Sequence, residues 1–511
     1  MRGMLLVLAL AAGARAQDVE WRTHRGNDAG WRYSELKEIH TGNVGRLVPK
    51  WMFQTKVPGS NETTPLVMNG LMYVTANSNN AFAIDLRSGH EIWHYSKKPP
   101  KPLDLCCGEV NRGFGAVGDR LFKVNIEDTL VALDRATGKL LWETMLGDYR
   151  KGYSGTVAPL IVKNKVLVGT GGAEFGTRGF VDAYAPETGE RLWRFYTVPE
   201  AHEPAAATWG KQALRVGGST WITGTYDPEL NLTYWGTGNP GPDMDGDVRP
   251  GDNLYTCSII ALDPDTGKLK WHFQFTPHDT HDWDAVADPV LVDLAIRGRK
   301  VKAVIQANRN GYFYALDRTN GKFLFAKPYT EINWSTGIDE NGRPKLVAGL
   351  DPSEAGKRVC PGMPGGHNWQ ATAYSRLTGF YYFSSTDGCQ TFYKNPGEFV
   401  EGAWYQLSGT EDLKSNPSKG SVIAVDPATG AIQWRFPMQR NPSGGLLATA
   451  GGLAFIGDYA GNLIAFDGRT GKVLWRFQTG AAIHAAPVTY TFEGKQYIAV
   501  AAGETIVVFG L

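Results

Sequence analysis

Residues 132–142 read A-L-D-R-A-T-G-K-L-L-W, and variants of this phrase recur along most of the 511-residue chain. Each copy follows an apolar, strand-like run, turns at the Asp and the Thr-Gly pair, and in its full form ends at an aromatic residue. An Asp that opens a turn and a Gly that accepts a positive φ favour a tight connection between two antiparallel strands. The aromatic ring then packs between neighbouring sheets, where its burial contributes about 1.5–3 kcal/mol. The phrase therefore predicts one β-hairpin per copy.

Eight copies of the phrase occur, most of them 41 to 54 residues apart. They begin at Ala83, Ala132, Ala183, Ala261, Ala315, Ala373, Ala424 and Ala465; the copy at Ala183 lacks the Asp, and the copy at Ala373 is degenerate. One such sheet cannot bury both of its faces, so the copies must stack in a ring. The sequence thus predicts an all-β, eight-bladed β-propeller as a single domain over residues 17–511. The strand that ends at Trp51 is expected to close the ring with the last copy.

The N-terminus has the pattern of a secretory signal peptide. Residues 1–3 carry positive charge, residues 4–12 are apolar, and Ala14-Arg15-Ala16 matches a cleavage site. A leader over residues 1–16 predicts an exported, periplasmic protein, and no other stretch is long and apolar enough to span a membrane. Without Arg2 and Arg15 the formal net charge changes from +1 to about −1, and this balance gives no indication of nucleic-acid binding.

Acidic residues gather at 276–284, which read T-P-H-D-T-H-D-W-D after a strand-like run. Asp282 and Asp284 are two residues apart, so in an extended segment both carboxylates leave on the same face. Paired carboxylates repel one another unless a cation or a shared proton offsets them. The stretch therefore predicts either a site for a hard cation with a general base or a solvated acidic loop. The wide gaps at 193–271 and 325–434 predict long loops that carry function or cover a site.

The repeated phrase resembles the tryptophan-docking motif of alcohol dehydrogenases that depend on pyrroloquinoline quinone (PQQ). The stretch from Asn27 to Val44 is also similar to the N-terminal signature of that family. The resemblance covers essentially the whole mature chain and implies a quinoprotein fold. Non-enzymatic propellers of the bacterial envelope carry the same repeats, so a scaffold protein is the alternative that the repeats leave open.

The chain has five cysteines, and an exported protein is expected to oxidise some of them. An odd number leaves one thiol over, which we assign to Cys257. The neighbours Cys106 and Cys107 resemble the family's adjacent-cysteine disulfide, which lies against one face of the quinone; two buried thiols are the alternative. Cys360 and Cys389 resemble a second family disulfide with a structural role. A covalently attached haem is excluded because the chain contains no C-x-x-C-H motif.

The resemblance also implies where the cofactor binds. Trp221 matches the Trp that stacks on the other face of PQQ, and it lies outside every copy of the repeat, which argues against a docking role. PQQ has three carboxylates, so its rim needs donors and cations. The residues that match the cofactor-binding positions of the family are Glu62, Arg112, Thr156, Gly172, Ala173, Ser219, Arg309 and Asn368.

Glu174 and Asn239 match the family's metal ligands, and their oxygen atoms suit Ca²⁺. Asp282 matches the catalytic base next to the metal, and Asp284 matches the extra carboxylate of members that use a lanthanide. A trivalent ion of similar size needs one more anionic ligand, so we expect a lanthanide, with Ca²⁺ as the alternative. Arg309 corresponds to the cation beside the base. The alternative interpretations are that Asn239 is an ordinary turn residue and that Arg309 lies in a surface hairpin.

By resemblance, the expected reaction is the oxidation of small primary alcohols to aldehydes, with Asp282 taking the hydroxyl proton and a hydride passing to metal-bound PQQ. Since the chain has no haem motif, the reduced cofactor must pass its electrons to a separate protein, and a soluble cytochrome c is the expected acceptor. Ser443 occupies a position at which alcohol dehydrogenases of this family often have a Trp, which leaves the preferred alcohol open. The oligomeric state is also open.

Overall fold

The computed structural model describes residues 18–414 and 417–511, so the leader predicted at residues 1–16 lies outside the described range. In these residues the regular structure is almost entirely β-strand. The helical segments described are single 3-10 turns: η1 (Val44–Arg46), η2 (Tyr149–Lys151), η3 (Ala173–Phe175), η4 (Pro204–Thr208) and η5 (Gly246–Val248). Within the described ranges, no helix is long and apolar enough to cross a membrane.

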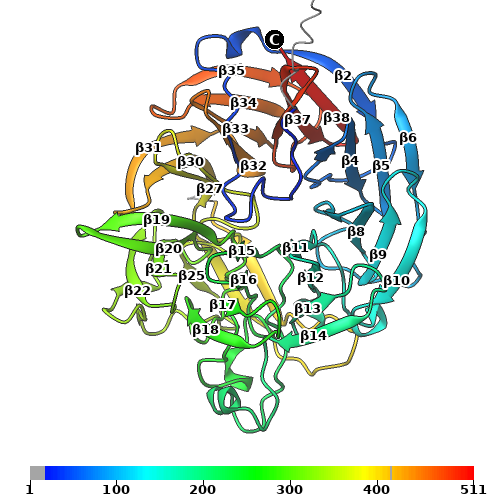
Figure 1. Ribbon diagram of the computed structural model, residues 1–511. Coiled ribbons are helices and arrows are strands. Elements are labelled where there is room, and N and C mark those ends of the chain that lie inside the picture. Colours follow the sequence, from blue (N-terminus) through cyan, green and yellow to red (C-terminus); the bar gives the residue numbers. More distant parts are fainter. Residues whose placement is uncertain (1–17, 415–416) are drawn as a thin grey trace, which may run out of the picture.

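The described strands form eight sheets of four or five strands, and Figure 1 shows them arranged as a ring around a common centre. A ring of such sheets is a β-propeller. Four of the sheets are β3–β6 (Leu66–Met68, Leu71–Ala76, Asn80–Asp85, Glu91–Tyr95), β7–β10 (Gly115–Val117, Arg120–Asn125, Thr129–Asp134, Leu140–Met145), β11–β14 (Leu160–Val162, Lys165–Gly169, Phe180–Tyr184, Arg191–Tyr196) and β15–β18 (Thr225–Asp227, Leu232–Gly236, Ser258–Leu262, Leu269–Gln274).

The other four sheets complete the ring. They are β19–β22 (Val290–Ile296, Arg299–Ala307, Tyr312–Asp317, Phe323–Pro328), β26–β27–β30–β31 (Ala373–Tyr374, Tyr381–Asp387, Lys419–Asp426, Ala431–Met438), β32–β35 (Pro442–Thr449, Leu453–Asp458, Asn462–Asp467, Val473–Gln478) with β1 (Tyr33–Ser34) added in parallel, and β36–β38 (Val488–Phe492, Lys495–Ala502, Thr505–Gly510) with β2 (Val48–Gln54). Two smaller sheets lie in the insertions: β23–β24 (Ser335–Ile338, Pro344–Leu346) and β25–β28–β29 (Lys357–Val359, Gln390–Lys394, Ser408–Asp412).

The repeated phrase forms the turn between the last two strands of a sheet and also joins that sheet to the next one. In the copy at Ala132, Gly138 has a φ of 69°, and a Cβ placed there would lie 2.5 Å from the indole ring of Trp93 in the preceding sheet. The same indole N–H donates to the carbonyl of Arg135 at 3.0 Å. The glycine is therefore needed both for its backbone conformation and for the space that it leaves to the ring.

The same pair of contacts recurs around the ring. Indole N–H groups donate to turn carbonyls at 3.0–3.2 Å from Trp51 to Leu86, Trp142 to Pro186, Trp193 to Pro264, Trp271 to Arg318 and Trp434 to Gly468. Each of these rings also lies against the turn glycine of the sheet that it contacts. The predicted hairpins and the packing of their aromatic residues thus explain how neighbouring sheets are joined.

Two details differ from the prediction. The degenerate copy at Ala373 does not form a sheet of its own, because β27 pairs with β30 and places both copies in one sheet. The strand that contains Trp51 does not pair with the copy at Ala465 either. It pairs with β38, in a separate sheet beyond the last copy, so the two ends of the chain together close the ring.

The N-terminal segment reaches the inner strands of several sheets (dark blue in Figure 1). Backbone carbonyls of Asp28 and Ala29 accept hydrogen bonds from β15 and β19, those of Trp31 and Arg32 accept from β26 and β32, and Trp21 forms a bridge to Val67 in β3. The segment therefore ties distant sheets together from within the ring.

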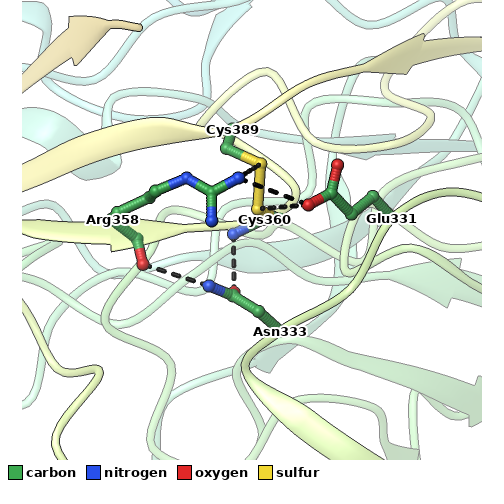
Figure 2. The surroundings of a disulfide bond; sticks show 5 residues. All are labelled: Glu331, Asn333, Arg358, Cys360 and Cys389. Carbon is green, nitrogen blue, oxygen red and sulfur yellow. Dashed lines mark hydrogen bonds and ion pairs between the residues drawn. A yellow bond between two sulfur atoms is a disulfide. The ribbon is translucent and has the colours of Figure 1, made fainter. Parts of the chain in front are cut away.

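A disulfide between Cys360 and Cys389 fastens the largest insertion (Figure 2). Cys360 follows β25 and Cys389 precedes β28, so the bridge reinforces the pairing of these two strands. Arg358 donates to the Cys389 sulfur at 3.2 Å, and Asn333 holds the backbone N–H of Cys360 at 2.7 Å. This result confirms the predicted second disulfide.

Candidate cofactor and metal site

The acidic stretch at 276–284 meets Arg309, which lies in the turn after β20. The Arg309 guanidinium donates from Nη1 and Nη2 to the two carboxylate oxygens of Asp282, at 3.3 and 3.2 Å, and its Nη1 lies 3.3 Å from Oδ2 of Asp284. The backbone differs from the expected extended segment, since Asp282 has a φ of 58° in the left-handed region. Such a conformation is costly for a non-glycine residue and is typical of functional sites.

Asp284 connects this ion pair to two other parts of the ring. Its Oδ2 accepts from the indole N–H of Trp221 at 2.9 Å, and its Oδ1 accepts from the backbone N–H of Asn239 at 2.7 Å. Gly238 leaves room for the arrangement, because a Cβ there would lie 2.7 Å from both Oδ1 of Asp284 and Oγ of Ser219. Residues that are 63 positions apart in the sequence thus meet at one carboxylate.

Glu174 enters the same region from the single turn η3. Gly172 precedes that turn with a φ of 99°, and its lack of a side chain allows close contact with the carbonyl of Gly152. The carboxylate of Glu174 lies with the sulfurs of Cys106 and Cys107 in a group whose atoms are all within 4.8 Å of one another. Cys106 and Cys107 form a disulfide, as predicted, and the leftover thiol is the buried Cys257.

The carboxylates of the site, of which Asp284 is buried and Glu174 and Asp282 are partly buried, are difficult to ionise in the absence of a bound cation. Burial, together with the charge of Asp284, raises the pKa of Glu174 to about 7. Burial also raises the pKa of Asp282 well above its usual range and raises the pKa of Asp284, although Arg309 opposes both shifts. Because the charged forms lose hydration and repel one another, a bound cation would offset a cost that the protein otherwise carries.

Arg112 provides a cationic group with free donors. It forms an ion pair with Glu62 at 2.7 Å, and its guanidinium carbon lies 5.0 Å from the ring centre of Trp221 and 5.5 Å from that of Trp369. Its Nε and Nη1 are buried, yet they donate to no described residue. A buried guanidinium with two unused N–H groups is suited to a carboxylate ligand.

Three further residues singled out in the sequence are Thr156, Asn368 and Ser443. The hydroxyl of Thr156 donates to the carbonyl of Trp221 at 3.5 Å, and its own carbonyl accepts from Arg112 at 3.2 Å. Asn368 donates to the carbonyl of Pro364, while its buried Oδ1 has no partner among the described residues. Ser443 is buried, and its hydroxyl donates to the carbonyl of Ile483 at 2.8 Å.

Two residues near the site were missed by the sequence reasoning. Trp369 follows Asn368 directly and contacts Arg112. Like Trp221 it lies outside every copy of the repeat, and this signal could have found it. Asp243 is 1% exposed and interacts with Glu174 and Asn239. The one feature of the sequence that could have pointed to Asp243 is its position in a Gly- and Pro-rich loop, inside one of the wide gaps between repeats.

The donor set fits both a metal ion and an anionic organic cofactor. Glu174, Asn239, Asp282 and Asp284 offer carboxylate and amide oxygens, which are the ligands of hard cations. Arg112 and Asn368 offer buried polar atoms that lack partners within the described chain. Trp221 and the Cys106–Cys107 disulfide provide an aromatic ring and a pair of sulfurs beside them.

Comparison with known proteins gives matches along nearly the whole chain. The family model described as "Glucose/ethanol/alcohol dehydrogenase, beta-propeller domain" matches residues 21–341, and one described as "Outer membrane protein assembly factor BamB" matches residues 418–510. The quinoprotein alcohol dehydrogenase PedH of Pseudomonas putida is 38% identical over 503 residues, 93% of this chain and 84% of the relative. The lanthanide-dependent methanol dehydrogenase of Methylacidiphilum fumariolicum is 36% identical over 524 residues, 95% of this chain and 84% of that relative.

Among solved structures, a europium-containing methanol dehydrogenase superposes with a TM-score of 0.92 at 33% identity, covering 96% of this chain and 98% of that chain. Fold and site together define the class of β-propeller proteins with a buried, acidic site made by loops from several sheets. The matched family model and the relatives narrow this class: the chain belongs to the family of PQQ-dependent alcohol dehydrogenases.

Proposed function

We propose that this protein oxidises small primary alcohols to aldehydes at the site around Asp282, with PQQ and a metal ion as cofactors. The observation that carries the proposal is the meeting of Asp282, Asp284 and Arg309 in one ion-pair cluster, to which Trp221 and Asn239 are hydrogen-bonded. A part-buried carboxylate with a raised pKa beside a guanidinium has the properties of a general base.

The cofactor would be held by its edges and its two faces. Arg112, Thr156, Ser219 and Asn368 are the proposed partners of the PQQ carboxylates and carbonyls, and Glu62 orients Arg112 through their ion pair. Trp221 and the Cys106–Cys107 disulfide are the proposed contacts of the two faces, while Gly172 and Ala173 shape the turn below. When bound, PQQ and its metal ion supply the electron-accepting group of the reaction.

The metal ion would be bound by Glu174, Asn239, Asp282 and Asp284. We favour a lanthanide over Ca²⁺ because three carboxylates in one buried site demand more positive charge than a neutral donor set would. Among the relatives, one methanol dehydrogenase is named lanthanide-dependent and another contains europium. Ca²⁺ remains the second candidate, since it takes the same oxygen donors.

The roles of the two catalytic residues follow from their contacts. Asp282, in its ionised form, would accept the proton of the substrate hydroxyl, and PQQ held at this site would supply the acceptor for the carbinol hydride. Arg309 holds Asp282 through two hydrogen bonds and faces the developing negative charge of the site. Arg309 also donates from Nε to the carbonyl of Met363 at 3.0 Å, which fixes the orientation of its guanidinium.

The proposal also includes the number of propeller blades, the location of the protein and its electron acceptor. We interpret the eight described sheets as the blades of an eight-bladed propeller whose neighbours are joined by tryptophan-docking motifs. The pattern at residues 1–16 supports cleavage of a signal peptide and a periplasmic location. A soluble cytochrome c is the proposed electron acceptor, and 1-butanol dehydrogenase (cytochrome c) of Thauera butanivorans is a relative at 36% identity over 538 residues.

A non-catalytic envelope propeller that scaffolds other proteins is the second candidate. Residues 418–510 match the BamB model, so the docking repeats alone do not separate the two functions. The site does separate them, because a scaffold has no use for buried carboxylates with raised pKa values around Arg309.

Reconstitution tests the proposal directly. The purified protein is loaded with PQQ together with either La³⁺ or Ca²⁺, and ethanol-dependent reduction of an artificial dye is measured. Turnover with at least one ion, and none with PQQ or metal alone, is the expected result. Absence of PQQ binding with both ions would refute the proposal and favour the scaffold.

A further inference from the structure

A fourth carboxylate, that of Asp243, lies next to the proposed metal site. Asp243 belongs to the loop between β16 and β17, four residues after Asn239, and is 1% exposed. Its Oδ1 accepts a hydrogen bond from none of the residues that the structure describes. A buried carboxylate oxygen without a donor is costly, so its retention calls for a partner.

The backbone contacts of Asp243 place it beside Glu174. The backbone N–H of Asp243 donates to the carbonyl of Gln406 at 3.2 Å, and the carbonyl of Glu174 accepts from the N–H of the adjacent Tyr405 at 2.6 Å. Tyr405 and Gln406, which are neighbours in a distant part of the sequence, thus hold the backbones of Glu174 and Asp243 close to each other. The Asn239 side chain and the charges of Glu174 and Asp284 all act on the Asp243 carboxylate.

Arg249 fixes the loop without neutralising Asp243 through a direct bond. This fully buried guanidinium donates to the carbonyls of Pro242, Asp243 and Asp279 and to the side chain of Asn253. All of these hydrogen bonds go to carbonyl and amide oxygens, so the Asp243 carboxylate can still bind another cation. Arg249 thus ties the loop to three carbonyls and one amide, and the Asp243 oxygen to which no described residue donates belongs to a carboxylate beside Glu174 and Asn239.

We propose that Asp243 is an additional ligand of the metal ion bound by Glu174, Asn239, Asp282 and Asp284, and that it favours a trivalent ion over a divalent one. The inference rests on the proposed function, because it assumes the metal site described above. With Asp243, the site has four carboxylates: Asp282 and Asp284 form ion pairs with Arg309, whereas Asp243 has only the more distant charge of Arg249 beside it. A larger number of anionic oxygens favours the ion of higher charge when the ions are of similar size.

Terbium binding tests the inference without relying on turnover. Tb³⁺ luminescence sensitised by nearby tryptophans is titrated in the wild-type protein, in Asp243→Asn and in Asp247→Asn, a control on the exposed side of the same loop where Asp247 pairs with Lys394. We expect Asp243→Asn to weaken Tb³⁺ binding about tenfold or more and to weaken Ca²⁺ binding, measured by competition, by a smaller factor. The control should bind both ions like the wild type.

Luminescence lifetimes in H₂O and D₂O separate a ligand from a merely structural residue. Asp243→Asn removes only the charge, whereas Asp243→Ala removes the ligand atom and should admit about one additional coordinated water; Asp243→Glu should restore much of the Tb³⁺ affinity. Unchanged affinity in a folded Asp243→Asn protein, together with unchanged hydration in a folded Asp243→Ala protein, would overturn the inference while leaving the proposed function intact. If the wild type binds neither Tb³⁺ nor Ca²⁺, the proposed metal site fails and the inference fails with it.

Discussion

The outer turns of the propeller and its centre use aspartates in opposite ways. In the turn after β9, Asp134 accepts from the backbone N–H and the hydroxyl of Thr137, at 2.8 and 2.6 Å, and the Thr137 hydroxyl lowers the pKa of Asp134. At the centre, burial raises the pKa values of Asp282 and Asp284. Turn aspartates satisfy their own backbone, whereas the central ones are held where their charge is unfavourable.

The turn aspartates stabilise the fold, whereas the central carboxylates serve the proposed site and depend on the fold for their positions. Each turn aspartate has partners within three or four positions in the sequence, so its contribution is local and repeated from sheet to sheet. Each central carboxylate is positioned by distant segments and adds a desolvation cost to the folded state. Natural sites of this kind lower stability in return for function, and substitutions in the two regions should therefore have opposite effects.

The largest expected effect is that of Asp282→Asn on turnover. Without the base, ethanol oxidation by the reconstituted enzyme should fall about 10²–10⁴-fold. The metal-free variant should be at least as stable as the wild type to thermal unfolding, because a carboxylate whose charged form is disfavoured by desolvation has been replaced by a neutral amide. Dye-linked assays and melting curves measure the two quantities, and Asp134→Asn serves as the turn control. Retained turnover in Asp282→Asn would refute its role as base.

The next effect concerns the choice of metal. Asp284→Ala should abolish lanthanide-supported activity and spare calcium-supported activity, because a trivalent ion depends more on the extra carboxylate. Lanthanide affinity is expected to fall about 100-fold. Titration with La³⁺ and Ca²⁺ followed by assays measures both, with Asp247→Ala as a surface control. Intact activity with La³⁺ would contradict the assignment of Asp284.

Metal uptake should depend on pH through Glu174. Its pKa is raised to about 7 by burial, and a cation binds the ionised form, so binding releases a proton below that pH. Affinity is therefore expected to fall about tenfold for each pH unit below 7 if one proton is released. The stability of the metal-free protein has the opposite pH dependence. Because the pKa of Glu174 is higher in the folded than in the unfolded state, its contribution to stability is present at low pH and is lost as the pH rises through 7.

Calorimetric titration with La³⁺ at pH 5.5, 6.5 and 7.5 measures this dependence. The variant Glu174→Gln, which does not ionise, should bind weakly and with less pH dependence. An affinity that stays constant over the three pH values would show that Glu174 is already ionised in the folded protein.

How far the sequence predicts the structure follows from the same contrast. The hairpins and the Trp93–Gly138 type of contact were predictable because their determinants lie within one short phrase. The sheet assignment of the copy at Ala373 was wrong because β27 pairs with β30 across a long insertion, which no local pattern encodes.

The site shows the same limit. Family resemblance named Glu174, Asn239 and Asp282, and the structure brings these residues together. Asp243 was missed because its position is set by hydrogen bonding to Gln406, far away in the sequence. The left-handed backbone of Asp282 was also missed, since sequence spacing alone suggested an extended strand.

The smallest expected effect is that of a single turn aspartate on stability. Asp134→Ala removes two hydrogen bonds to Thr137 in a partly exposed turn and should lower the free energy of unfolding by about 0.5–1 kcal/mol. Because its pKa is lower in the folded than in the unfolded state, this contribution is present at neutral pH. It is lost as the pH falls below the ordinary range of a carboxyl group. Denaturant unfolding at pH 7 and pH 3 measures both values, with the exposed Asp119→Ala as control.

Double substitutions test whether aspartates in the turns act independently and whether those at the site act together. Asp134 and Asp467 lie in turns of different sheets and share no partner, so the stability losses of Asp134→Ala and Asp467→Ala should add within about 0.5 kcal/mol. Asp282 and Asp284 both contact Arg309, so their substitutions should not add, because the second leaves the guanidinium buried without either carboxylate. Additive behaviour at the centre would mean that the two carboxylates act independently, and the distinction between the turns and the site would then be wrong.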